Sequence, residues 1–410
     1  MVLMMATASA QEQPASRAAQ LLEKIPAEPK APAVAAPLVG ALPPLEFYRA
    51  LQPGVPGLEA VYEAVGAEDV ERAQSAFATY LRTKEFDPAA LEVLPVKEAG
   101  IAKTGAGEAA AARKITLLGK THSYGESIDW TGNPSEFPDW PLLLNRHGHW
   151  RDLALAYQQT GNPAHLNAFA GQLDSWLTEA RMPGMIQQAQ ARSISRDKGH
   201  RRPFAPAWRT IEVGERLRDA WPKAFGTFVR QPGLDDATLV RMAAAMVRQA
   251  DFLVEFQGPQ NWFALENDGL LRTAAIFPEF SRARVWKDEA LGRIAAQLND
   301  EVYPDGAHIE LTPWYQETVR SATSGIVGLS RSLGLDLSPS AVEKFEKLHL
   351  SNMASVQPDG RAPQVNDADP LRVEYILREG AKRFNRPDML YVATRGSEGT
   401  PPAFVSTSLP

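Results

Sequence analysis

From residue 147 to residue 356 the chain repeats one plan, in which a helix, a short turn and another helix follow each other. Apolar side chains at helical spacing predict eight helices, near residues 147–159, 163–180, 207–222, 235–257, 262–276, 283–302, 313–333 and 339–356. Glycine, proline and asparagine punctuate the breaks, as in Gly161-Asn162-Pro163 and Pro304-Asp305-Gly306. Alternation typical of strands is nearly absent, so the pattern predicts an all-α fold.

The helix pairs recur at a spacing of roughly 50 residues, which is typical of an α/α solenoid or a closed toroid. In such an array alternate helices run parallel, so the helices near 147, 207, 262 and 313 begin on one side. Converging helix N-termini attract anions, and aromatic rings offer flat surfaces to sugars. We therefore expect a ligand cleft at these four starts, which carry Asn145, Arg146, His147, His149, Trp208, Arg209, Asn261, Trp262, Trp314 and Tyr315.

Composition excludes several kinds of site. The 410-residue chain has no cysteine, so disulfides, zinc–thiolate sites and a cysteine nucleophile are excluded. A net charge of −6 indicates no basic surface for nucleic acid. No stretch approaches the ~20 apolar residues of a membrane span. Gly119-Lys120-Thr121 fails as a phosphate-binding loop, and the Asp367 and Asp369 pair is typical of a solvated turn, so we predict neither a cofactor nor a metal.

The N-terminal part differs from the helical array. Met1 to Ala10 reads either as the end of a secretory signal, with Ala8-Ser9-Ala10 as a small-x-small site, or as an accidental alanine-rich tail. Residues 11–44 are a linker rich in proline and alanine. Two short helices are expected at Leu58–Val65 and Asp69–Lys84, and a flexible loop over 98–113. The signal-like start favours a periplasmic or secreted protein.

Asp305 to Gln316 place a tyrosine just after a helix-start signal. Thr312 is a suitable N-cap and Pro313 a suitable first helical residue. Tyr315 then falls in the first turn, where the helix dipole could depress its pKa and allow proton transfer. The alternative is an amphipathic helix start with Trp314 and Tyr315 packed in the core.

Several segments, in order, resemble the helical domain of the heparinase II/III-like polysaccharide lyases over roughly residues 45–380. They are Leu144–Trp150, Trp208–Glu212, Gln260–Leu271 with Phe277–Phe280, and Tyr303–Tyr315. The resemblance implies an (α/α) toroid of helical hairpins followed by a β-sandwich domain, and β-elimination of a uronic-acid-containing polysaccharide. The β-sandwich has no counterpart in this sequence, so residues 381–410 are expected to form a connection towards it. The resemblance also implies that the sandwich domain contributes a histidine to the active site. The chain is therefore expected to be either an active polysaccharide lyase or a partial or inactive fragment of one.

The resemblance also implies residue roles. Asn261 matches the asparagine that neutralises the substrate carboxylate, and Tyr315 matches the catalytic tyrosine. Glu266 is expected either to orient Asn261 or to be structural, and Arg216 to pair with Glu212. The expected contacts of an acidic polysaccharide or oligosaccharide are Asn145, Arg146, His147, Trp208, Arg209, Trp262, Glu266, His308 and Trp314.

Two other functions remain open on the sequence. One is a carbohydrate-binding toroid without catalysis. The other is an inverting glycoside hydrolase, which needs two carboxylates about 6.5–9.5 Å apart, and Asp305 and Glu310 are its candidates.

Overall fold

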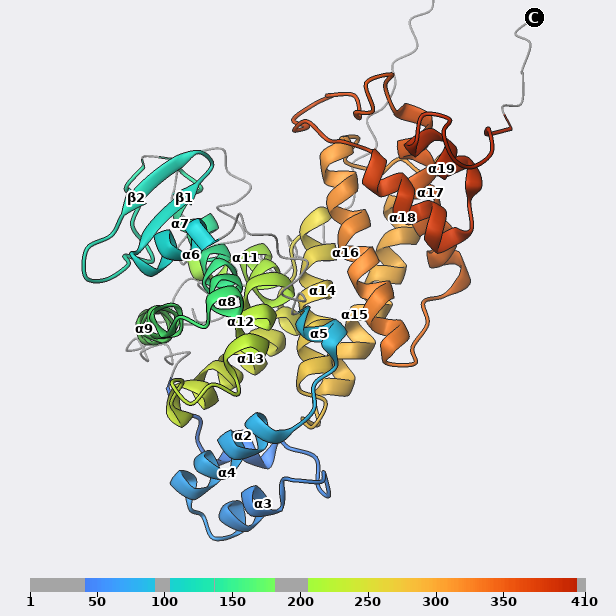
Figure 1. Ribbon diagram of the computed structural model, residues 1–410. Coiled ribbons are helices and arrows are strands. Elements are labelled where there is room, and N and C mark those ends of the chain that lie inside the picture. The colour runs from blue at the N-terminus through green and yellow to red at the C-terminus, as the bar shows by residue number, and fades with distance from the viewer. Residues whose placement is uncertain (1–40, 93–103, 136, 181–205, 404–410) are drawn as a thin grey trace, which may run out of the picture.

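The computed structural model describes residues 41–92, 104–135, 137–180 and 206–403 (Figure 1). The signal-like N-terminus, nearly all of the proline-rich linker and most of the long segment at 182–206 lie outside these ranges. Within them the chain is mostly helical, and the predicted all-α toroid is confirmed. No helix in the described ranges is both long and apolar enough to cross a membrane.

The predicted helices of the array are present and close to their expected bounds. They are α8 (Gly148–Thr160), α9 (Pro163–Glu179), α11 (Thr210–Glu215), α12 (Trp221–Phe228), α13 (Asp236–Glu255), α14 (Asn261–Ile276), α15 (Ala283–Glu301), α16 (Pro313–Ser332) and α17 (Pro339–Ser355). The short helix α7 (Trp140–Leu144) precedes them and was not predicted. The helix expected at 207–222 is interrupted, because the 3₁₀ turn η2 (Pro206–Trp208) precedes α11 and the π-helical turn η3 (Arg216–Ala220) joins it to α12.

Helix α14 is the centre of the inner layer. It packs against both α11 and α16 and also against its hairpin partner α15 (Figure 1). The approach to α11 is close, since a Cβ atom added at Gly269 would lie 2.7 Å from the Gly214 carbonyl oxygen. Alternate helices are therefore direct neighbours, as in a toroid, and their starts lie on one side.

The N-terminal helices α2 (Leu45–Arg49), α3 (Glu59–Gly66), α4 (Val70–Thr83) and α5 (Pro88–Leu91) confirm the two short helices predicted there. A buried ion pair ties them to the array. Lys84 Nζ lies 2.7 Å from the Glu279 carboxylate and also donates to the Ile276 carbonyl at 2.9 Å. The segment after α4 is thereby attached to the end of α14.

The expected loop at 98–113 is wrong over residues 104–111, which form α6 (Thr104–Ala111). Gly107 is a packing residue here, because a Cβ at this position would lie only 2.2 Å from the Ala156 Cβ on α8. A hairpin follows, with β1 (Lys114–Leu117) antiparallel to β2 (Lys120–Ser123). Leu118 and Gly119 both have positive φ, as a tight two-residue turn requires.

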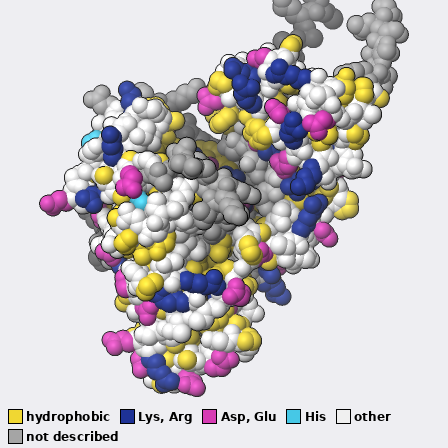
Figure 2. Space-filling model, viewed as in Figure 1, with side chains coloured by type: hydrophobic (Ala, Val, Ile, Leu, Met, Phe, Trp, Pro, Cys, Tyr) yellow, Lys and Arg dark blue, Asp and Glu magenta, His cyan; other side chains and the backbone are white. Residues whose placement is uncertain are grey.

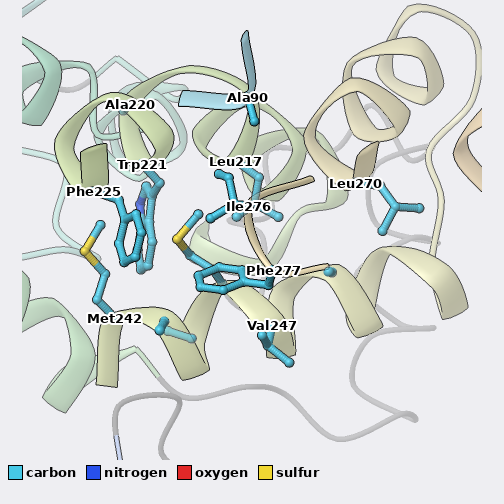
Figure 3. Packing of buried hydrophobic residues seen from close by; sticks show 14 of the residues in the cluster. Ala90, Leu217, Ala220, Trp221, Phe225, Met242, Val247, Leu270, Ile276 and Phe277 are labelled. Carbon is cyan, nitrogen blue, oxygen red and sulfur yellow. The ribbon is translucent and has the colours of Figure 1, made fainter. Parts of the chain in front are cut away.

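The core lies between the inner and outer helices. Figure 3 shows Leu217, Trp221 and Phe225 from η3 and α12 facing Phe277 at the end of α14 and Met242 on α13. A smaller cluster joins α17 to α18 (Glu374–Phe384) and α19 (Pro387–Ala393) through buried side chains that include Ile376, Leu377 and Met389. Helical packing thus continues past residue 380 into the segment expected to be a connection.

Candidate active site

Asn261 is the first residue of α14 and is almost completely buried. Its Nδ2 donates to both carboxylate oxygens of Glu310, at 2.8 and 3.0 Å, and its backbone N–H donates to the same carboxylate at 3.2 Å. The first N–H groups of a helix have no partner within the helix, and the positive end of the dipole stabilises an anion there. Glu310 therefore caps α14 and fixes the asparagine side chain.

Tyr315 lies in the first turn of α16, and its hydroxyl donates to Asp367 Oδ2 at 2.7 Å. This hydrogen bond is the main reason that the pKa of Tyr315 rises to about 12; burial and the charges of Asp367, Glu310 and Asp369 act in the same direction. The expectation of a depressed pKa is thus wrong, because three carboxylates outweigh the helix dipole. The phenol stays protonated at neutral pH.

Glu310 interacts with both Asn261 and Tyr315. It holds Asn261, and its charge acts on the phenol of Tyr315. Burial raises the pKa of Glu310, although the hydrogen bonds from Asn261 and the nearby His308 oppose this. The His308 ring is buried behind it, with Nε2 3.1 Å from Glu301 Oε2 and Nδ1 3.5 Å from Glu310 Oε2. His308 is therefore placed to support Glu310.

Three side chains extend the site along the neighbouring helix starts. Both Arg146 and Arg209 bind the fully buried Glu212, with Arg146 Nη2 at 3.1 Å and Arg209 Nη2 at 2.6 Å from the same oxygen. Burial disfavours the charged guanidinium of Arg209, but the hydrogen bonds and charge of Glu212 outweigh it and raise its pKa. The Arg209 guanidinium centre also lies 4.8 Å from the centre of the Trp262 ring.

The contact between Arg209 and Trp262 connects the two arginines to the start of α14, because Trp262 directly follows Asn261. We call Arg146, Arg209, Trp262, Asn261 and Tyr315 the helix-start row. Arg146 and Arg209 keep 28% and 23% of their side-chain surface exposed, so each is accessible to a ligand. Trp314, next to Tyr315, is 37% exposed and presents an indole beside the row.

Three predicted contact residues are core residues instead. Asn145 is fully buried and donates to the carbonyls of Trp130 and Pro141. His147 and Trp208 are also buried, and lie behind the row rather than on its surface. Polar residues near a helix start satisfy the sequence criterion equally well whether they face the cleft or the core.

Two other predictions are resolved by hydrogen bonds. Glu266 accepts the Gly258 N–H with both oxygens, at 3.0 and 2.8 Å, and so supports the turn before α14. Arg216 does not pair with Glu212 as expected. The Arg216 guanidinium instead donates to the Gln249 side chain and to the carbonyls of Asn145 and Ala207, because Glu212 binds the two other arginines.

Sequence reasoning missed the roles of Glu310 and Asp367. Glu310 lies inside the segment that sequence analysis singled out, so its proximity to Tyr315 was a usable signal. Asp367 lies 52 residues from Tyr315 and has no such signal. The loop that carries it is held to the start of α16 by a second contact, in which Asn366 Nδ2 donates to the Leu311 carbonyl at 2.7 Å.

A cavity of about 550 Å³ lies further along α14 and α16. Its wall includes Arg218, Arg272 and Arg320, but Asp268 binds the first two and Glu379 the third. The positive charges of these arginines are thus balanced by carboxylates beside them. Figure 2 likewise shows acidic and basic side chains interspersed over the visible face. In the described ranges no group of three or more acidic or histidine side chains is arranged to hold a metal.

Comparisons with known proteins identify the family to which this helical domain belongs. A family model described as heparinase II/III N-terminus matches residues 47–390. A heparin-sulfate lyase from Pedobacter heparinus is 24% identical over 293 residues, which cover 70% of this chain and 42% of that protein. A heparin-sulfate lyase from Bacteroides stercoris is 24% identical over 292 residues, covering 69% of this chain and 44% of that protein. The chain thus spans less than half the length of these relatives.

Solved structures share the fold. A heparinase III crystal structure matches with a TM-score of 0.75 at 18% identity, over 88% of this chain and 57% of that one. The heparan sulfate lyase HepC from Pedobacter heparinus matches with a TM-score of 0.64 at 22% identity, over the same shares. At these sequence identities the structural likeness establishes the fold alone. Membership of the family rests on the family model, which covers most of the chain. The chain belongs to the heparinase II/III family, of which it carries the N-terminal helical domain.

Proposed function

We propose that this chain is a polysaccharide lyase that cleaves a uronic-acid-containing polysaccharide by β-elimination. The proposal rests on the position of Asn261 and Tyr315 at the starts of two adjacent inner helices, together with Glu310, which binds Asn261 and whose charge acts on Tyr315. The lyase relatives support the class of reaction. A polymer substrate of this kind fits a periplasmic or secreted protein.

The reaction removes the proton on C5 of a uronate, next to the carboxylate. That proton is too weakly acidic while the carboxylate keeps its full negative charge, so a site must stabilise the enolate-like state. Nδ2 of Asn261 carries two hydrogens. Nδ2 lies 2.8 and 3.0 Å from the two Glu310 oxygens, which one hydrogen can serve, and we assign the second hydrogen to a substrate carboxylate at the positive end of α14.

Tyr315 supplies the proton that the leaving glycosidic oxygen needs. A general acid must hold its proton before the bond breaks, and the Asp367 hydrogen bond keeps the phenol protonated. The same surroundings disfavour Tyr315 as the base, because a phenolate needs cationic neighbours and those acting on it are carboxylates. We therefore propose Tyr315 as acid, with a different group accepting the C5 proton.

Arg146, Arg209 and Trp262 would bind neighbouring sugars. Partly exposed guanidinium groups attract carboxylates or sulfates, and the Trp262 ring is held in place by Arg209. The hydrolase alternative has less support. Asp305 is exposed and accepts the Ala307 N–H in a turn, and Glu310 holds Asn261.

The test is absorbance of the unsaturated uronate product in the ultraviolet, with heparan sulfate, hyaluronan and alginate offered separately. We expect Tyr315→Phe and Asn261→Ala to abolish most of the signal. Tyr375→Phe is the matched control, because this tyrosine also binds a carboxylate, Glu317, at 3.0 Å but lies on α18. Unchanged turnover in both site variants would refute the proposal. Release of reducing ends without absorbance would favour a hydrolase, and binding without turnover a carbohydrate-binding protein.

A further inference from the structure

Two polar side chains of α15 reach the start of α14. Gln297 and Glu301 are four residues apart, so they share one face of α15 at its C-terminal end. Gln297 Nε2 donates to the Gln260 carbonyl and to Glu301 Oε2, both at 2.7 Å. Because Gln260 directly precedes Asn261, α15 contacts the backbone that carries the asparagine of the site.

The same Glu301 oxygen also binds His308. Nε2 of His308 lies 3.1 Å from Glu301 Oε2, and it is the donor because an ionised carboxylate only accepts hydrogen bonds. On the other side of the ring, Nδ1 accepts the backbone N–H of Glu310 at 3.4 Å. The Ile309 N–H donates to the Glu301 carbonyl at 2.9 Å. The loop that carries Glu310 is thus held against the end of α15.

These contacts form a closed ring with the hydrogen bonds between Glu310 and Asn261. The Glu310 carboxylate accepts from the backbone N–H and from Nδ2 of Asn261, and Asn261 is joined to Gln260 by a peptide bond. The ring therefore connects the end of α15, the loop before α16 and the start of α14. We call its six members the asparagine ring: Gln260, Asn261, Glu310, His308, Glu301 and Gln297.

The peptide bond between Gln260 and Asn261 is held from both sides. It is trans, so its carbonyl oxygen and its N–H point in opposite directions. Gln297 binds the Gln260 carbonyl on one side, and Glu310 binds the Asn261 N–H on the other. Rotation of this peptide would break both hydrogen bonds. The ring therefore fixes the backbone from which the Asn261 amide projects.

The backbone of Gln260 has a conformation that requires such support. Its φ of 55° and ψ of −129° correspond to the first central position of a type II′ turn, which glycine usually occupies. A residue with a Cβ atom persists there only where the surrounding structure holds it. The Gln260 side chain is exposed, so its own burial does not hold it. The hydrogen bond from Gln297 to its carbonyl does.

The orientation of the Gln297 amide is determined by its two partners. The residue is 4% exposed, and its Oε1 has no hydrogen-bond partner in the described part of the chain. A buried polar atom without a partner requires an explanation. Turning the amide would place Oε1 against the Gln260 carbonyl and the Glu301 carboxylate, which are both acceptors. The unpartnered oxygen thus follows from the position of Nε2 between two acceptors.

We propose that Gln297 and Glu301 are positioning residues for Asn261, which hold its amide in the orientation that the substrate carboxylate requires. This inference rests on the proposed function of the chain. Gln297 acts through the Gln260 peptide, and Glu301 acts through His308 and the Glu310 loop. Because the uronate carboxylate gains negative charge in the enolate-like state, a misplaced amide should lower kcat more than it raises KM.

The experiment compares kcat, KM and Tm of Gln297→Met with those of the unaltered protein, with turnover followed by product absorbance. Methionine fills a similar volume and removes both hydrogen bonds together with the unpartnered oxygen. The Gln260 carbonyl keeps the Phe263 N–H at 3.0 Å, and Glu301 keeps His308. We therefore expect kcat to fall about 3- to 10-fold while Tm stays within about 2 °C.

Gln172→Met is the matched control. Gln172 is a buried glutamine on α9 whose Nε2 donates to the Ala110 carbonyl at 2.8 Å and whose Oε1 accepts the Trp150 Nε1–H at 3.2 Å. Its replacement leaves both partners unpaired, so it should lower Tm without changing kcat. A purely structural role of Gln297 would give the same result as this control.

Two variants of Glu301 separate its hydrogen bonds from its presence. Glu301→Gln keeps an acceptor oxygen for Gln297 and His308 and should retain most of kcat, whereas Glu301→Ala should lower kcat about 3- to 10-fold. The crystal structure of Gln297→Met shows the geometry independently of turnover. In it we expect the Gln260 backbone to leave its positive φ or the Asn261 amide to leave Glu310.

Failure of this inference is distinguishable from failure of the proposed function. Absence of turnover in the unaltered protein would refute the proposed function, and the crystal structure of Gln297→Met would still test the ring. The positioning role is wrong if an active protein keeps its full kcat in Gln297→Met, if Glu301→Gln loses as much as Glu301→Ala, or if Gln260 and Asn261 keep their conformations in the variant crystal.

Discussion

Replacing Asp367 by asparagine tests the pairing that defines the proposed acid. The change removes the carboxylate charge and the strong acceptor of the Tyr315 hydroxyl, which is the largest cause of its raised pKa. The pKa of Tyr315 is about 12, against an ordinary value of 10.0. Because this phenol is partly exposed and solvent screens the charge, we expect a fall of about one unit, or about 1.4 kcal/mol.

The sign of the kinetic effect follows from the role of the phenol. A general acid acts only while it is protonated. A lower pKa of Tyr315 therefore shifts the alkaline limb of the kcat/KM profile to lower pH, by about one unit. Activity at neutral pH should change little through protonation, and any loss there reports misplacement of the hydroxyl.

The assay is product absorbance across alkaline pH, together with the ultraviolet difference titration of each protein against its Tyr315→Phe counterpart. Asp369→Asn is the matched control, because the charge of Asp369 contributes least to the raised pKa of Tyr315. An unchanged or upward-shifted limb in Asp367→Asn, or an equal shift in the control, would refute the reasoning.

Three further predictions concern the site and its support. Glu310→Ala releases the asparagine that it binds and should lower kcat/KM by about 5- to 100-fold, measured by product absorbance; an unchanged value would contradict the positioning role. Gly269→Ala should destabilise the protein by about 1–3 kcal/mol in urea unfolding, whereas Gly292→Ala, which meets no atom within 4 Å, should be neutral or stabilising. Burial lowers the pKa of His149 to about 3 from 6.5, so the unfolded chain binds its proton first and stability should fall as pH drops below 6.5; His149→Phe should reduce this fall in acid unfolding, and His122→Phe should not.

Local sequence signals were enough for most of the helices. Proline, asparagine and aspartate at helix starts act through their own backbone geometry and capping, so Asn162 caps α9 and Asp235 caps α13 without information from the rest of the chain. Where the local sequence fitted both a loop and a helix, tertiary packing determined which of them formed. Gly107 is typical of a loop in sequence, but its missing Cβ lets α6 approach α8 closely.

The sequence alone determined the helical array, the positions of its inner helix starts and the polar residues gathered there, because helix periodicity and capping act over a few residues. It also placed Asn261 and Tyr315 at two of those starts. Only the tertiary structure decided which polar residues face outward and which are core. It brought Glu310 to Asn261 and Asp367 to Tyr315. The pKa of Tyr315 rises rather than falls because carboxylates distant in sequence lie beside it, and no local pattern encodes their approach.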